Sequence, residues 1–228
     1  MRAAGSPLAR RLEPLSMLVL GDAHANDDAH REALLATYDA VDAYSALQVG
    51  DLGYYDLPTP TWFVAGNNED LDVVDRLRSG ESPAGTSNVH LLASEVTDVG
   101  GLRVAGLSGN YAPTQYEKSR DELVGGRRRH FVRDDVERAK ALSDVDVFLT
   151  HEAPHGLLRE DGYDVGCKHV DAVLRAVEPD LCLVGHHHRH VEGDFGPTTV
   201  VGLAPVWEAY YRLDPETLEL DRRPAPEP

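Results

Sequence analysis

The sequence has little cysteine, no long hydrophobic run and no excess of basic residues, and each absence excludes a class of protein. Its 228 residues contain two cysteines, Cys167 and Cys182, too few and too isolated for a disulfide framework or a thiolate zinc site. The apolar runs have the length of strands, well short of the roughly 20 residues that a membrane helix requires. We therefore predict a soluble protein with no membrane partner and two structural cysteines, Cys182 within a buried strand.

The charge balance is strongly acidic. Asp and Glu total 39 against 22 Lys and Arg, a formal net charge of −17, and arginine greatly outnumbers lysine. This composition argues against a broad basic face for nucleic acid. It suggests a halophilic protein, because molar salt shortens the Debye length to about 3 Å and removes most self-repulsion. An ordinary acidic cytoplasmic protein is the alternative interpretation.

The chain organisation predicts one domain. A hydrophobic fraction of 42% over this length is enough for one compact core. Residues 1–16 lack the apolar segment and cleavage site of a secretory signal, which predicts a cytoplasmic protein with a flexible N-terminal tail. Residues 222–228 are too rich in proline to continue a strand or helix, so we expect a domain over 17–221 and a flexible C-terminal tail.

Five tracts of metal-ligating residue types each follow a short β-type run. The tracts are Asp22-Ala23-His24, Gly50-Asp51, Gly66-Asn67-Asn68-Glu69, Thr150-His151-Glu152 and Gly185-His186-His187-His188, and the runs are 17–20, 46–49, 62–65, 145–149 and 181–184. Ligands at strand ends are held on a rigid frame. Imidazole and carboxylate without thiolate suit Mn, Fe or Zn better than Cu(I) or an iron-sulfur cluster. Together the tracts predict a dinuclear metallohydrolase.

The order of these tracts resembles the calcineurin-like metallophosphoesterases, whose pattern is D-x-H, G-D, G-N-H-[DE], a lone His and G-H-x-H. The resemblance covers nearly the whole chain and implies an α/β fold, a two-sheet β sandwich flanked by helices. It also implies two divalent metal ions, with Mn as the first choice and Fe, Zn, Ni or Mg open. Two ions about 3.5–4 Å apart can hold a phosphoryl oxygen and generate hydroxide at neutral pH.

The resemblance assigns ligands to each ion. The first ion would be held by Asp22, His24, Asp51 and His188, and the second by Asp51, Asn67, His151 and His186. Asp51 is the natural bridge between them. His187 has no ligand role in the family. On an extended backbone it points away from its neighbours, so we favour a site-lining or supporting role over direct coordination.

One departure from the family pattern affects the mechanism. The histidine that usually protonates the leaving oxygen is replaced by Asn68, and an amide cannot supply that proton. General acid catalysis is typically worth about 10²–10⁴-fold, so poor leaving groups should suffer most. His155, His187 or water on the metal could substitute, and the sequence does not choose among them.

A second set of motifs narrows the resemblance to the branch that includes lariat RNA debranching enzymes. These are the glycine-rich segment 99–111, the arginine-bearing segment 127–131 and the tract 148–154, although this chain is shorter and lacks the C-terminal extension. Arg127, Arg128 and Arg129 could grip substrate phosphates through bidentate hydrogen bonds, or form a solvated cluster paired with carboxylates of the protein. Tyr111 could stack on a base or phenyl group, or cover apolar surface.

Between the ligand tracts the pattern alternates strand and helix. Asp27 or Asp28 can cap a helix through about Ala40, and Asp134-Asp135 can open another through Leu142. Short β runs at 102–107, 191–195, 198–203, 206–213 and 217–220 suggest a second sheet.

The leading hypothesis is a phosphodiesterase in which hydroxide held between two ions attacks phosphorus in line. The partner would be a phosphodiester, with nucleotides or RNA as one candidate class; the oligomeric state stays open. A phosphomonoesterase is the close alternative. A non-catalytic metal-binding module for protein interaction is the rival from another class, and Asn68 is the residue that favours it.

Overall fold

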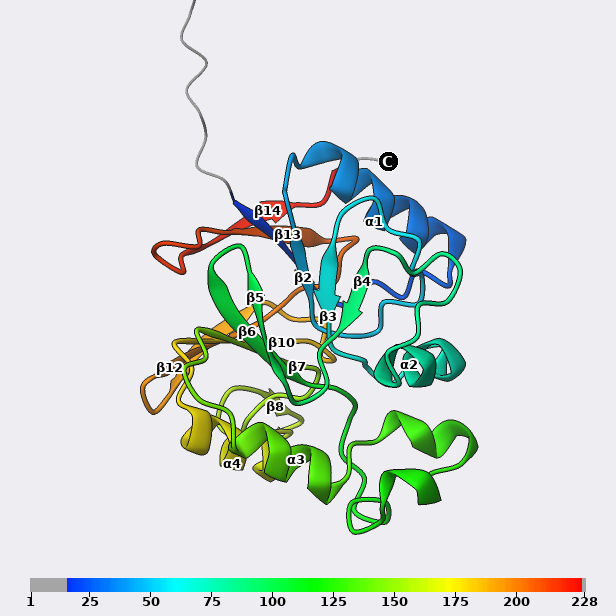
Figure 1. Cartoon of the computed structure of the whole chain (residues 1–228). Coiled ribbons are helices and arrows are strands. Elements are labelled where there is room, and N and C mark those ends of the chain that lie inside the picture. Colours follow the sequence, from blue (N-terminus) through cyan, green and yellow to red (C-terminus); the bar gives the residue numbers. More distant parts are fainter. Residues whose placement is uncertain (1–15, 227–228) are drawn as a thin grey trace, which may run out of the picture.

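Two mixed six-stranded sheets stack face to face in this computed structural model, which describes residues 16–226 (Figure 1). Sheet A has the order β14-β13-β1-β2-β3-β4, with bounds Leu220–Pro224, Ala209–Leu213, Met17–Leu20, Ala46–Gln48, Thr61–Phe63 and Val89–Leu91. Sheet B has the order β11-β12-β10-β7-β6-β5, with bounds Val191–Phe195, Thr198–Gly202, Leu181–Val184, Val147–Thr150, Leu102–Leu107 and Val96–Val99. A separate hairpin pairs β8 (Arg159–Glu160) with β9 (Tyr163–Asp164).

Helices cover the outer faces of the two sheets (Figure 1). The α-helices are α1 (Asp28–Ala40), α2 (Leu71–Arg78), α3 (Arg133–Lys140) and α4 (Lys168–Val177), and the 3₁₀ helices are η1 (Arg120–Glu122) and η2 (Gly125–Arg129). The side chain of Asp27 caps α1 by accepting from the amides of Ala29 and His30 at 3.0 and 3.2 Å. The helix expected through Ala40 is therefore confirmed. The predicted fold, a two-sheet α/β sandwich flanked by helices, is also confirmed.

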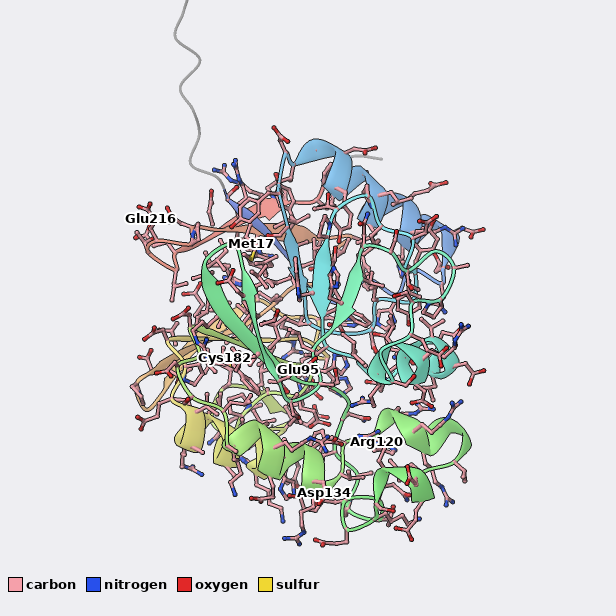
Figure 2. All side chains as sticks on the ribbon, viewed as in Figure 1. Met17, Glu95, Arg120, Asp134, Cys182 and Glu216 are labelled. Atoms are coloured by element: carbon pink, nitrogen blue, oxygen red, sulfur yellow. The ribbon has the colours of Figure 1, made fainter. Side chains whose placement is uncertain are left out.

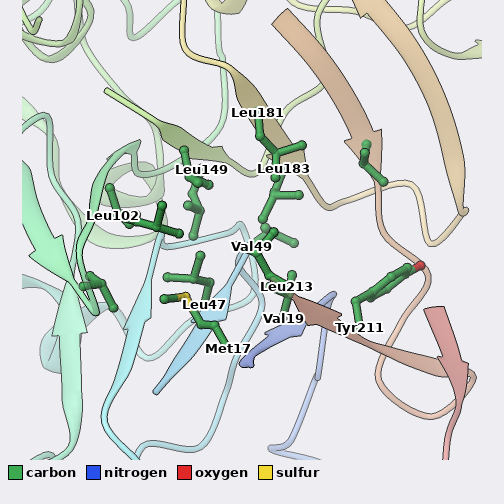
Figure 3. Close-up of a cluster of buried hydrophobic side chains, with 14 of the residues drawn as sticks. Met17, Val19, Leu47, Val49, Leu102, Leu149, Leu181, Leu183, Tyr211 and Leu213 are labelled. Atoms are coloured by element: carbon green, nitrogen blue, oxygen red, sulfur yellow. The ribbon is translucent and has the colours of Figure 1, made fainter. Parts of the chain in front are cut away.

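Side chains along β1 alternate between the two faces of sheet A, so this sheet packs against one core on each face. Met17 and Val19 face sheet B and pack with Leu149 and Leu183, in the layer between the sheets (Figure 3). Leu18 and Leu20 face the other way and pack under α1. A third cluster lies between the outer face of sheet B and helices α3 and α4, and includes Cys182 and Cys167. Burying one such leucine contributes about 1.5–3 kcal/mol, so these layers hold the frame rigid.

The expected membership of the second sheet is partly wrong. The runs 102–107, 191–195 and 198–203 do join sheet B as β6, β11 and β12. The later runs instead join sheet A, because β13 pairs antiparallel with β1, with Met17 opposite Leu213. The segment 217–220 forms mainly the turn before β14, and the helix expected over 134–142 ends at Lys140.

The expected ends of the domain also change. The predicted C-terminal tail is wrong for residues 222–224, which continue β14 to Pro224 opposite Ala209. Proline is tolerated there because β14 is an edge strand, where one missing amide costs little. Of the predicted N-terminal tail, residues 1–15 lie outside the described part of the chain. Ser16 is buried and its hydroxyl accepts from Arg212 Nε at 2.9 Å, so it belongs to the folded domain.

No helix within residues 16–226 combines the length and the apolar character that crossing a bilayer requires.

Candidate metal centre

The seven predicted ligands come together at one edge of the sandwich. β1, β2 and β3 are parallel neighbours in sheet A, and β7 and β10 are parallel neighbours in sheet B. The carboxyl ends of parallel neighbours meet at the same edge of a sheet. The loops after these five strands therefore carry every predicted ligand to one place. That the seven side chains bind metal stays a prediction.

Four of these side chains form a first cluster, which we call half-site 1. His24 Nε2 lies 3.1 Å from His188 Nε2, and His188 Nε2 lies 3.1 Å from Asp22 Oδ2. His24 Nε2 also lies 3.5 Å from Asp51 Oδ2. Asp22 and Asp51 are almost fully buried, each with 1% of its surface exposed.

A second cluster, half-site 2, lies on the other side of the same carboxylate. His151 Nε2 is 3.1 Å from Asn67 Oδ1 and 3.2 Å from His186 Nδ1. It is also 3.7 Å from Asp51 Oδ2. One oxygen of Asp51 therefore faces both clusters, as the predicted bridging role requires.

These separations fit the predicted ions. Ligand atoms placed about 2.0–2.2 Å from one ion lie roughly 3 Å from each other. In each half-site two histidine ring nitrogens lie close together, at 3.1 Å in half-site 1 and 3.2 Å in half-site 2, a separation that a shared proton or a bound cation allows. Asp22, His24 and His188, and separately Asp22, Asp51 and His151, offer atoms within 4.8 Å of one another. The donor set of imidazole, carboxylate and amide oxygen suits Mn, Fe or Zn.

The tautomer of His151 follows from its second ring nitrogen. Nδ1 lies 2.9 Å from the carbonyl oxygen of Val49, which can only accept, so Nδ1 carries the proton. The lone pair of Nε2 then points into half-site 2. His151 has no exposed surface, so burial and this hydrogen bond fix the ring before any ligand arrives.

The electrostatics of the cluster prepare it for cations. Burial would raise the pKa of Asp22, but the pKa is lowered overall by His151, by the hydrogen bond to His188 and by the His186 amide. The hydrogen bond to Asp22 raises the pKa of His188. Burial, followed by the nearby His151 and His187, lowers the pKa of His186 to about 4. His186 is therefore neutral at pH 7 and keeps the lone pair that a metal ligand needs.

Four of the predicted ligands adopt a left-handed backbone conformation. The φ angles of His24, Asp51, His186 and His188 are 45°, 55°, 71° and 52°. This region is uncommon for residues other than glycine and costs of order 1–3 kcal/mol each. Such strain clusters at functional sites. The extended backbone assumed around His187 is therefore wrong, because both of its neighbours are left-handed. The sequence pattern carried no signal for this conformation.

Gly185 allows the two sheets to approach each other at the ligands. A Cβ on Gly185 would lie 2.4 Å from Asp22 Oδ1, closer than any real contact. A side chain at this position would therefore displace the carboxylate of half-site 1.

Asn68 holds the carboxylate of Asp51, the predicted bridge. Its backbone amide donates to Asp51 Oδ1 at 2.7 Å, and its side-chain amide donates to Asp51 Oδ2 at 2.8 Å. In the sequence, Asn68 was notable because it stands where the family has a proton-donating histidine. The structure shows in addition that it positions Asp51. The adjacent Glu69 accepts from Leu52, Gly53 and Tyr55, which ties the loops after β2 and β3 together.

The three arginines of the insertion have three different environments. Arg128 forms ion pairs with Asp72 at 2.8 Å and Asp75 at 2.7 Å on α2, as the surface-cluster interpretation expects. Arg129 Nη1 donates to the carbonyl oxygen of Asn67 at 3.0 Å, a contact that the sequence did not reveal. Arg127 is exposed. The same insertion carries Arg120, labelled in Figure 2.

Tyr111 lies in an aromatic cluster. Its ring centroid is 4.6 Å from that of His169, 5.8 Å from Tyr116 and 6.1 Å from Phe131. Its backbone amide donates to Glu152 at 2.8 Å. These contacts favour the interpretation that Tyr111 covers apolar surface.

His187 and His155 lie in different surroundings. His187 Nδ1 is 3.2 Å from Glu160 on the β8–β9 hairpin, and its ring meets the His186 ring edge-on at 5.0 Å. His155 Nδ1 is 3.0 Å from Asp171 of α4. His187 is therefore the candidate proton donor beside the ligands.

Trp207 is a neighbour that the sequence analysis missed. Its ring centroid lies 5.4 Å from that of His188 and 5.9 Å from that of His24, and it stacks on His30 at 4.0 Å. This packing restrains both histidines of half-site 1.

Comparison with known proteins bears on these observations. The model of the calcineurin-like phosphoesterase family matches residues 8–190. A lariat debranching enzyme of Entamoeba histolytica is 25% identical over 186 residues, covering 70% of this chain and 52% of that protein. The lariat debranching enzyme of Schizosaccharomyces pombe is 31% identical over 156 residues, covering 58% of this chain and 33% of that protein. The chain thus spans about half of one relative and a third of the other.

Solved structures share the fold. The crystal structure of TT1561 from Thermus thermophilus has a TM-score of 0.64 and 18% sequence identity, and covers 93% of this chain and 99% of that chain. This likeness concerns the fold alone. The family match spans all of the ligand tracts, from Asp22 to His188, and the resemblance predicted from those tracts is confirmed: the chain belongs to the calcineurin-like phosphoesterase family.

Proposed function

We propose that the protein is a phosphodiesterase dependent on two divalent metal ions. The observation that carries this proposal is Asp51 Oδ2, which lies 3.5 Å from His24 Nε2 in half-site 1 and 3.7 Å from His151 Nε2 in half-site 2. When bound there, two ions would supply a water nucleophile active at neutral pH and positive charge beside the phosphoryl oxygens. Manganese is the ion we propose first.

The side chains of the protein perform the positioning. Asn68 keeps the Asp51 carboxylate aimed at both half-sites, and Val49 keeps the lone pair of His151 aimed inward. Because these groups are fixed before substrate arrives, little reorganisation is needed during the reaction. Burial of Asp22 and Asp51 limits competing water around both carboxylates.

The side-chain amide of Asn68 cannot protonate the oxygen of the leaving group, so another residue must supply that proton. We assign that role to His187, whose Nδ1 faces the Glu160 carboxylate at 3.2 Å and whose neighbours in sequence are two predicted ligands. The carboxylate of Glu160 orients the ring of His187 through this contact. Diesters with good leaving groups depend least on this proton, and we expect them to be turned over fastest.

We propose a nucleotide or RNA diester as the substrate, because of the relatives that this chain resembles. Both curated relatives bear the name lariat debranching enzyme, so nucleotide or RNA diesters are the class to test first. The acidic composition further supports a protein that works in concentrated salt, where repulsion between its carboxylates and a phosphate is screened.

The test compares bis-p-nitrophenyl phosphate with p-nitrophenyl phosphate in molar salt. Metal-stripped protein is resupplied with Mn²⁺ beside Asp51→Asn, which keeps the shape but removes the charge shared by the half-sites. We expect diester turnover that depends on added metal and is lost in the variant. Preference for the monoester would favour the monoesterase alternative. Binding of two ions with no turnover of either ester would favour a non-catalytic module.

A further inference from the structure

The β8–β9 hairpin has a two-residue turn and is held at its base by hydrogen bonds. Its two strands are joined by Asp161 and Gly162, with φ angles of 48° and 84°, the left-handed pair that a two-residue hairpin turn requires. At its base the carboxylate of Asp164 accepts from the amides of Gly156 at 2.8 Å and Gly166 at 2.9 Å. One side chain therefore ties together both ends of the hairpin.

The hairpin reaches the candidate metal centre through Glu160. Its carboxylate lies 3.2 Å from Nδ1 of His187, between the predicted ligands His186 and His188. Glu160 is paired directly opposite Tyr163. Residues paired across an antiparallel ladder place their side chains on the same face, with Cβ atoms about 4.5–5.5 Å apart. Tyr163 therefore lies on the face of the hairpin that meets His187.

Tyr163 is free to bind a planar ligand. It is 78% exposed, and its ring contacts no other aromatic ring within residues 16–226. Single exposed aromatic residues are common on protein surfaces, so exposure alone carries no function. The difference here is position, because Tyr163 is paired with Glu160, whose carboxylate contacts His187. Tyr111 and Trp207 are engaged in their own ring contacts.

We propose that Tyr163 stacks on a nucleobase of the substrate next to the scissile phosphate, an inference that rests on the proposed phosphodiesterase function. Stacking on an aromatic side chain is tolerant of sequence because every base presents a π face. The preferred substrates are then nucleotide diesters with little preference among bases. Tyr163 determines this specificity, whereas His187 and the predicted ligands serve any diester.

The experiment uses two esters that share one leaving group. Thymidine 5′-(p-nitrophenyl phosphate) carries a base, and ethyl p-nitrophenyl phosphate does not. Tyr163→Ala removes the ring, Tyr163→Phe keeps it, and Arg159→Ala is the matched control on the opposite face of the same hairpin. Calorimetric binding of thymidine 5′-monophosphate and of ethyl phosphate to the metal-loaded proteins provides a readout that is independent of turnover.

We expect Tyr163→Ala to raise KM for the thymidine ester at least about 5-fold, the low end of measured stacking effects, with little change in kcat. The Kd of thymidine 5′-monophosphate should rise by the same factor, while Tyr163→Phe, Arg159→Ala and both ethyl compounds change less than about 2-fold.

An unchanged Kd for thymidine 5′-monophosphate in Tyr163→Ala would overturn the inference, as would equal losses for the thymidine and ethyl compounds. If the unaltered protein turns over neither ester, the phosphodiesterase proposal fails separately. The binding measurements then still decide whether Tyr163 contacts a base.

Discussion

Replacing Asn68 with alanine distinguishes a positioning role from a role at the leaving group. The substitution removes the 2.8 Å hydrogen bond from the side-chain amide to Asp51 Oδ2 and leaves the 2.7 Å bond from the backbone amide to Oδ1. The carboxylate then keeps one of two donors and can rotate about the remaining bond. Because Oδ2 faces His24 and His151, both half-sites should weaken together.

The expected size of the effect follows from the charge of the acceptor. A hydrogen bond to a charged group contributes about 1.5–3 kcal/mol. Losing partners that orient metal ligands typically costs about 10- to 100-fold in metal affinity, which agrees with that range. We therefore expect the dissociation constants of both Mn²⁺ ions in Asn68→Ala to rise about 10- to 100-fold, measured by calorimetric titration of metal-stripped protein.

A control variant and a series of leaving groups test this prediction further. Asn88→Ala is the matched control, because Asn88 donates to the Leu57 carbonyl away from the ligands, and its metal affinity should match the unaltered protein. The dependence of rate on leaving-group acidity should also stay the same in Asn68→Ala. Metal affinities within about 2-fold of the unaltered protein, combined with a changed leaving-group dependence, would refute the positioning argument.

Three further changes test other contacts. Arg129→Met removes the 3.0 Å hydrogen bond to the Asn67 carbonyl, so ion binding at half-site 2 should weaken about 5-fold, with half-site 1 unchanged; equal loss at both in metal titrations would contradict this. Leu183→Ala opens a cavity between the sheets and should lower the free energy of unfolding by about 2–5 kcal/mol in urea; a loss below about 1 kcal/mol would contradict its packing. In metal-free protein, the unfolded state binds more protons at His186 between pH 6.5 and about 4, so stability falls as pH falls through that window. Relative to His186→Asn, the loss on going from pH 7 to 4 should be about 2 kcal/mol after allowance for partial exposure, and a flat difference in denaturation curves would contradict it.

The sequence predicted which polar residues meet at one edge of the sandwich better than it predicted the sheets. Short apolar runs such as 17–20 and 181–184 identify buried strands, and polar residues directly after them lie at strand ends. The periodicity of a run does not specify its partner. The segment 206–213 was therefore assigned to the wrong sheet, since only the long-range pairing of Met17 with Leu213 places it beside β1.

Contacts between distant residues explain why the roles of other side chains could not be predicted. Arg128 meets Asp72 across 56 positions of sequence, and Arg129 meets the Asn67 carbonyl across 62. Adjacent arginines thus acquire different functions from the elements that fold against them. Tyr163 was missed for the same reason, because its position relative to His187 exists only once the hairpin forms.

The predicted ligands with left-handed backbones are held by hydrogen bonds that the sequence could not predict. The carbonyl oxygen of Asp51 accepts from the amide of Ala23 at 3.1 Å and from that of His24 at 2.6 Å, while the carboxylate of Asp22 accepts from the amide of His186 at 3.0 Å. Asp51, in the loop after β2, therefore holds the backbone of His24 in the loop after β1. Asp22, in the loop after β1, in turn holds the backbone of His186 in the loop after β10. Each aspartate is both a predicted ligand and a brace for another ligand. A glycine would relieve the strain at these positions but would remove the ligand, so the protein retains the side chains and stabilises their backbone through its neighbours. Motifs disclose the first role of each aspartate, and only the fold discloses the second.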